Sequence, residues 1–157
     1  MHLDDLKYRK RLLRRLNYLT DEDIVSLKGR VACHINAGDE LVITEMIMNG
    51  VFNDMTAEQI VALLSCFVYE NGDKKQHTLK EELYVLYRRL QEVARNIVAV
   101  SSECKIDMIE EEYLATFCPD MMEPVYAWCQ VSIFCIKSIF ERYLYFYLIY
   151  RANHLRK

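Results

Sequence analysis

The sequence predicts a mainly α-helical fold, and three observations favour this class. Apolar residues make up 52% of the 157 residues and charged residues 27%, which is enough apolar material for a core. Only 4 glycines and 2 prolines are present, too few for the many turns of a β-rich fold. Apolar residues also recur at helical spacing in several long segments. The length fits one ordinary domain, although a fragment of a larger protein also falls in this range.

The first predicted element is a basic amphipathic helix over residues 3–19, because Leu6, Leu13 and Leu16 recur near a 3.6-residue period. Basic residues fill the rest of its surface: Lys7, Arg9, Lys10, Arg11, Arg14 and Arg15. In residues 24–35 the apolar pattern is interrupted at Lys28-Gly29-Arg30. That interruption predicts a short β-hairpin or wing.

Two core helices are expected next. The apolar run Glu40 to Met48 predicts a buried helix that Asn49-Gly50 ends. Thr56-Ala57-Glu58-Gln59 then forms a capping box, in which the threonine oxygen accepts from the third amide of the helix. The helix that follows runs to about Glu70. Its apolar residues cover more than one stripe, so we expect it at the centre of the core.

A long amphipathic helix is predicted after a second capping box, Thr78-Leu79-Lys80-Glu81. Its apolar residues continue at helical spacing to about Val100. Shorter helices are expected at 110–117 and 120–129, on either side of Pro119.

Charge and cysteine usage narrow the class of function. The formal net charge of -3 provides no global basic field for nucleic-acid binding, so any RNA contact has to be local. No CxxC pair occurs, and the cysteines are predicted to be reduced thiols, which favours a nuclear or cytosolic location. They are Cys33, Cys66, Cys104, Cys118, Cys129 and Cys135.

Motifs for catalysis are missing from the sequence. It contains no GxxxxGK[ST] phosphate loop, no DExH or DExD box, no GxSxG, no HExxH and no Rossmann glycine pattern. The chain is therefore predicted not to be an enzyme by itself and to need no cofactor. No catalytic residue and no metal ligand is assigned: Glu110 to Glu112 are taken as a solvated face, and His34 and His77 have no partners at ligand spacing.

Ordered sequence blocks then carry a resemblance. They are Leu27-Lys28-Gly29-Arg30-Val31-Ala32-Cys33, Gly38-Asp39-Glu40-Leu41, Thr44-Glu45, Asn49-Gly50-Val51-Phe52-Asn53, Ala62-Leu63-Leu64-Ser65-Cys66-Phe67 and Val125-Tyr126-Ala127-Trp128-Cys129. Together they resemble the DSHCT region of exosome-associated DExH RNA helicases, over about residues 3–129. The block at 49–53 favours the nuclear exosome helicase branch over the cytosolic superkiller branch.

This resemblance implies a partial winged-helix remnant followed by an incomplete helical bundle. It divides the chain into the end of a winged-helix domain (1–38), a partial DSHCT helical bundle (39–130) and a divergent apolar tail (131–157). The implied function is an RNA-path and scaffold module of an ATP-dependent RNA helicase in exosome-linked RNA processing and decay. Its implied partners are single-stranded RNA, the exosome and its adaptor proteins. The implied location is nuclear, with a cytoplasmic location as the alternative.

Three residues are candidates for RNA contact. Glu70 resembles a family position where an acidic residue faces RNA, although a solvated glutamate at a helix end explains it equally well. Arg14 and Arg15 of the basic helix contact phosphates in one interpretation and solvate a packed helix in the other. His34 departs from the family, which usually has Glu there.

The tail, residues 131–157, departs from the family and lacks its second RNA-contacting helix. Its composition is typical of translated non-coding sequence, which favours a retained intron or a truncated gene model. A tail anchor is an alternative, but the charged residues Lys137, Glu141 and Arg142 count against membrane insertion. A third interpretation is an amphipathic helix that replaces the missing one. The alternative function is accordingly a protein-interaction or tail-anchored helical module without RNA binding.

Overall fold

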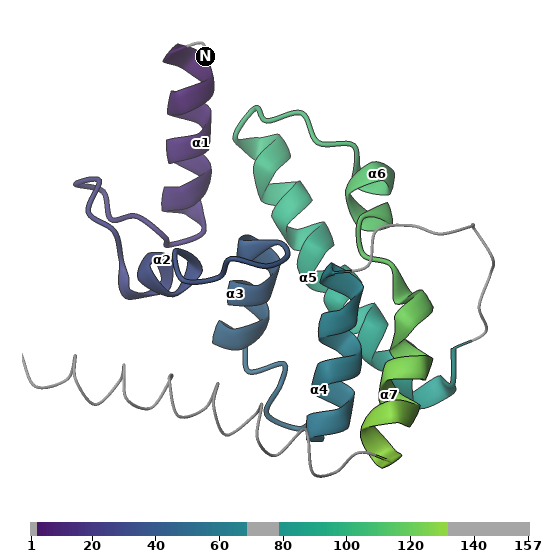
Figure 1. Cartoon of the computed structure of the whole chain (residues 1–157). Coiled ribbons are helices and arrows are strands. Elements are labelled where there is room, and N and C mark those ends of the chain that lie inside the picture. The colour runs from purple at the N-terminus through teal and green to yellow at the C-terminus, as the bar shows by residue number, and fades with distance from the viewer. Residues whose placement is uncertain (1–2, 69–78, 132–157) are drawn as a thin grey trace, which may run out of the picture.

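The computed structural model describes residues 3–68 and 79–131, and this part of the chain is built from α-helices, as predicted (Figure 1). The elements are α1 (Leu3–Arg15), α2 (Leu27–Ala32), α3 (Glu40–Met48), α4 (Ala57–Leu64), the 3-10 helix η1 (Ser65–Phe67), α5 (Glu81–Glu103), α6 (Glu110–Ala115), the 3-10 helix η2 (Pro119–Met121) and α7 (Met122–Val131). None of the helices described in these two ranges is long and apolar enough to cross a membrane.

The helices form two parts: a bundle of α3 to α7, and a side unit of α1, α2 and the loop between them. In Figure 1, α4 and α7 lie side by side and α5 passes beside α3, α4 and α6. The basic helix α1 stands at one edge, with α2 across its C-terminal end and α3 next to α2. The basic surface is thus on the side unit, away from α4 and α7.

The core lies where α3, α4, α5 and α7 meet. The long helix α5 contributes a stripe of buried side chains at the 3.6-residue period that the sequence predicts. Fully buried members of the core include Met46, Leu63, Leu83, Leu90, Ala94, Ile97 and Met122. Removal of these apolar side chains from water is the main contribution to the stability of the bundle.

The predicted hairpin at residues 24–35 is wrong. Its centre is the helix α2, and the β structure nearby is a single antiparallel bridge between Leu19 and Val25. Ser26 caps the helix by accepting a hydrogen bond from the Gly29 amide. Gly29 lies within this helix, and a Cβ at this position would lie 2.4 Å from the Tyr18 carbonyl oxygen. The glycine marks a close approach between two segments and not a turn.

The caps of α3 and α4 agree with their sequence patterns. Asp39 caps α3 by accepting from the Val42 amide, and Gly50 follows the helix with a left-handed φ of 68°. At α4 both hydrogen bonds of the predicted capping box are present between Thr56 and Gln59. The element is shorter than expected, since α4 ends at Leu64 and continues only as η1.

The predicted second capping box is wrong. Helix α5 begins at Glu81 and its N-cap is Lys80, whose side chain makes no capping bond; Thr78 lies outside the described residues. The Lys80 amide donates instead to Glu123 Oε1 of α7 at 2.7 Å. A distant carboxylate therefore satisfies an amide at this helix start.

The segment before η2 and α7 is fixed to η1, which continues α4, and to α5 by polar and aromatic contacts. The Cys118 amide donates to the Cys66 carbonyl at 3.2 Å, and the Tyr87 hydroxyl donates to the Phe117 carbonyl at 2.9 Å. The Phe117 ring packs edge-on against Phe67, with centroids 5.3 Å apart. These contacts join α4, α5 and α7 into one unit.

Candidate nucleic-acid interface

Helix α1 carries the basic surface that the sequence predicts. Asp4 and Asp5 lie in its first turn and Arg14 and Arg15 in its last. These charges interact favourably with the helix dipole at both ends and so stabilise the helix. Leu12 is the buried residue of the helix. The basic side chains therefore lie on the face that the bundle leaves uncovered.

Arg14 is held by the loop that follows α1. Its Nε and Nη2 atoms lie 3.2 Å and 2.7 Å from Asp23 Oδ1, and Lys10 Nζ lies 3.1 Å from Asp23 Oδ2. The two cations lower the pKa of the Asp23 carboxyl, mainly through their hydrogen bonds to it. All three side chains stay between 38% and 44% exposed, so the cluster is accessible from solvent.

Arg15 has a different partner, because it forms an ion pair with Glu103 at the end of α5. Successive residues on an α-helix point about 100° apart, which explains why Arg14 and Arg15 diverge. The structure therefore does not bring the two predicted RNA-binding arginines onto one spot. Arg9 and Arg11 are exposed and have no ion pair within the part of the chain that the structure describes.

Glu70, the third candidate, lies outside the described residues. Its position relative to Arg14 and Arg15 therefore stays a prediction.

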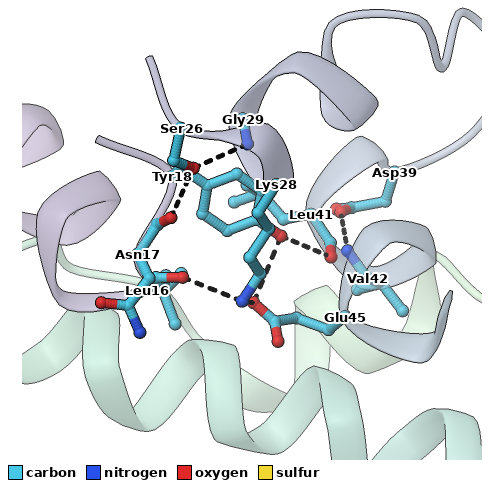
Figure 2. A network of polar contacts seen from close by, with 10 residues as sticks. All are labelled: Leu16, Asn17, Tyr18, Ser26, Lys28, Gly29, Asp39, Leu41, Val42 and Glu45. Atoms are coloured by element: carbon cyan, nitrogen blue, oxygen red, sulfur yellow. Dashed lines mark hydrogen bonds and ion pairs between the residues drawn. The ribbon is translucent and has the colours of Figure 1, made fainter. Parts of the chain in front are cut away.

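A polar network joins the side unit to the bundle, and sequence reasoning did not find it (Figure 2). Lys28 Nζ of α2 lies 2.6 Å from Glu45 Oε1 of α3 and donates to the Leu16 carbonyl at 2.8 Å. The Tyr18 hydroxyl oxygen lies 3.2 Å from both the Leu41 carbonyl oxygen and Glu45 Oε1, which share its one proton. Lys28 also lies 4.8 Å from the centroid of the Tyr18 ring.

This network is largely removed from solvent. Side-chain exposure is 19% for Lys28 and 12% for Glu45, and Tyr18 is buried. Burial, followed by the nearby Glu45 carboxylate, raises the pKa of the Tyr18 hydroxyl. Tyr18 therefore remains a hydrogen-bond donor at physiological pH. A serine before an apolar helix start, Ser26, was the one local sign of α2 in the sequence.

A second tyrosine connects α6 to the start of α3. The Tyr113 hydroxyl donates to Asp39 Oδ2 at 2.7 Å, while Asp39 Oδ1 accepts from the Val42 amide. Burial and the Asp39 carboxylate raise the pKa of Tyr113. Asp39 thus caps a helix and anchors another one at the same time.

The described residues contain free cysteines but no cluster that could bind a metal ion. Within residues 3–68 and 79–131, no group of three or more His, Cys, Asp or Glu side chains could hold a metal ion. His34 Nδ1 lies 2.7 Å from the Arg30 carbonyl oxygen. The described cysteines are free thiols: Cys33 is exposed, and Cys66, Cys104, Cys118 and Cys129 are buried. Burial raises the pKa of Cys66 to about 12, which favours the inert thiol form.

Comparison with known proteins gives the family. The model of the DSHCT (NUC185) domain matches residues 22–135. The chain belongs to the DSHCT family. Residues 22–135 include α2 to α7, so the Lys28–Glu45 ion pair lies within the matched region, whereas Tyr18 and α1 lie before it.

Relatives of this DSHCT chain are helicases by name. It is 47% identical over 134 residues to "Exosome RNA helicase MTR4" of Homo sapiens, and the aligned residues cover 85% of this chain and 13% of the relative. It is 50% identical over 135 residues to "ATP-dependent RNA helicase mtr4" of Schizosaccharomyces pombe, which covers 85% and 12%. The "Antiviral helicase SKI2" of Saccharomyces cerevisiae is 34% identical over 143 residues, with coverage of 88% and 11%. The DSHCT chain thus spans only about an eighth of the length of the curated relatives it matches.

Proposed function

We propose that this chain is an RNA-path and scaffold module of an ATP-dependent RNA helicase that acts in exosome-linked RNA processing and decay. The observation that carries the proposal is the DSHCT match together with 47% identity to a protein named as an exosome RNA helicase and 50% identity to one named as an ATP-dependent RNA helicase. The sequence contains no phosphate loop and no DExH box. The module is therefore non-catalytic by itself and contributes a binding surface instead of ATP hydrolysis.

Contacts with single-stranded RNA are assigned to Arg14, Arg15 and Glu70. The net charge of -3 requires local contacts, and α1 concentrates six basic residues in 13 positions. Both arginines have acidic partners, but these ion pairs are exposed and phosphates can replace the carboxylates.

The proposed location is the nucleus, and the proposed partners are the exosome and its adaptor proteins. Identity to the two MTR4 relatives is 47% and 50%, against 34% to the SKI2 relative, and this difference supports the nuclear branch over a cytoplasmic one.

The division of the chain also belongs to this proposal. We assign residues 1–38 to the end of a winged-helix domain, 39–130 to a partial DSHCT bundle and 131–157 to a divergent tail. The Lys28–Glu45 ion pair crosses the first boundary. It supports a scaffold in which the basic helix is held in a fixed orientation relative to the bundle.

A salt-dependent titration of labelled single-stranded RNA into the full chain tests the proposed contacts. Arg14→Gln/Arg15→Gln should weaken binding and flatten the slope of log K against log salt by about 1.4, since each lost phosphate contact removes about 0.7. Glu70→Gln should alter affinity without this change in slope. The matched control is Arg88→Gln/Arg89→Gln, an exposed pair that lies about 20 Å along α5 from Glu103.

The control should change the slope far less, although the net charge changes by the same amount. Absence of RNA binding by the unmodified chain would contradict the proposal and favour a protein-interaction module. An ATPase assay of the same preparation should show no turnover, and turnover above background would contradict the non-catalytic role.

A further inference from the structure

The loop between α1 and α2 folds back onto the basic helix. It is closed by the bridge between Leu19 and Val25, and within it the Thr20 amide donates to the Ile24 carbonyl at 2.9 Å. Thr20 Oγ1 accepts in turn from the Ile24 amide at 3.2 Å. Asp23 lies in this loop with a φ of 63°, a left-handed conformation that aspartate tolerates better than most residues. The loop thereby places one carboxylate over α1.

Each oxygen of that carboxylate is bound by a different cation. Asp23 Oδ1 accepts from Nε and Nη2 of Arg14, and Oδ2 accepts from Lys10 Nζ. Lys10 and Arg14 are four positions apart on α1, so they share one face. The two side chains form a preorganised site for an anion with two oxygens, and the chain's own carboxylate occupies it.

A phosphodiester has the same recognition chemistry. It offers two non-bridging oxygens that share one negative charge, and a guanidinium binds such a pair through parallel hydrogen bonds. Lys7 and Arg11 extend the basic surface of α1 beyond the site, and Arg11 has no ion pair in the described part of the chain. The basic row is therefore longer than the part that Asp23 neutralises.

We infer that Lys10 and Arg14 form a phosphate site for the RNA backbone, and that Asp23 is an internal competitor which occupies this site when RNA is absent. The inference rests on the proposed RNA-path function and adds to it a specific site and a device that lowers its affinity. Because the three side chains are 38% to 44% exposed, a phosphate can replace the carboxylate without unfolding the loop.

The test uses the full chain and a fluorescein-labelled oligouridylate, titrated over a range of salt concentrations. Asp23→Asn keeps a side chain that tolerates the left-handed backbone and removes the charge. It should tighten binding about three- to tenfold at low salt, because the RNA phosphate no longer has to displace a carboxylate from Lys10 and Arg14. Asp23→Gly, which also relieves the backbone, should give the same gain. The double variant Asp23→Asn/Arg14→Gln should lose it.

Asp21→Asn is the matched control, because it removes one charge from the same loop and Asp21 has no ion pair in the described part of the chain. A gain in affinity equal to that of Asp23→Asn would show a general charge effect and overturn the inference. So would RNA binding by the unmodified chain that Asp23→Asn leaves unchanged, although the proposed function would then stand. If neither protein binds RNA, the proposed function fails and the inference fails with it.

Discussion

Lys28 Nζ on α2 and Glu45 Oε1 on α3 are 2.6 Å apart, in a position where both side chains are largely shielded from solvent (Figure 2). This ion pair between the basic side unit and the helical bundle is less exposed than the Arg15–Glu103 pair, which also joins them. Lys28 also caps the end of α1 through the Leu16 carbonyl. Lys28 therefore contacts both the end of α1 and the bundle helix α3.

Replacement of Lys28 by Met should lower the free energy of unfolding by about 3 kcal/mol, because the Glu45 carboxylate is left buried without its cation. Urea unfolding followed by circular dichroism measures this loss. The double variant Lys28→Met/Glu45→Met should recover a large part of it, since no uncompensated charge remains. A single variant as stable as the parent would contradict the structural role of the pair.

Gly29→Ala should destabilise the chain even though alanine is the better helix former. The added Cβ would lie 2.4 Å from the Tyr18 carbonyl oxygen and 2.8 Å from Val25 Cγ1, and overpacking of this kind costs about 1–3 kcal/mol. Asn96→Ala, at an exposed position of α5, is the control and should be neutral or slightly stabilising. Equal melting temperatures for Gly29→Ala and the parent would argue against the close approach of α2 to Tyr18.

Leu90→Ala should cost about 2–5 kcal/mol, because Leu90 is fully buried at the centre of α5 and its truncation leaves a cavity. Val85→Ala removes apolar atoms from the same helix at a position that is 44% exposed, and its effect should stay below about 1 kcal/mol. The comparison uses denaturant midpoints measured under the same conditions. Similar losses at both positions would mean that the packing of α5 differs from that described.

The thiols should react in the order of their exposure. Cys33 is exposed, whereas Cys66 is buried with its pKa raised to about 12. At pH 8, iodoacetamide should therefore modify Cys33 within the native state and Cys66 only after denaturant is added, since the thiolate is the reactive form. Peptide mass spectrometry over time distinguishes the two. Early modification of Cys66 in the native protein would contradict its burial.

Acid should weaken the contact between the loop and α1. The pKa of Asp23 is lowered by Arg14 and Lys10, so its contribution is present above the ordinary carboxyl pKa and is lost as pH falls through the depressed value. The difference in melting temperature between the parent and Asp23→Asn should therefore shrink as the pH falls below about 4. A difference that stays constant to pH 2 would show that Asp23 is not paired in solution.

Features that depend on neighbours in sequence could be predicted. The capping box at Thr56 and Gln59 and the stop at Gly50 are local, and the buried stripe of α5 follows from its 3.6-residue period. The family could be identified in the same way, because its sequence blocks are contiguous.

Features that depend on distant partners could not be predicted. Lys80 is capped by a carboxylate 43 positions away, and Arg15 is paired with one 88 positions away. In the sequence, Gly29 indicated a turn. Its actual role, to let α2 approach the Tyr18 carbonyl, is visible only in the fold. The ion pairs that separate Arg14 from Arg15 are likewise a property of the assembled structure.

Photocrosslinking shows directly whether the chain contacts RNA through its basic helix. The full chain is irradiated with a 4-thiouridine-containing single-stranded RNA, and crosslinked peptides are located by mass spectrometry. We expect crosslinks in the peptides that carry α1 and Glu70, and we expect those in α1 to be lost in Arg14→Gln/Arg15→Gln. Crosslinks that avoid both peptides, or that are absent under conditions where a positive control crosslinks, would contradict it.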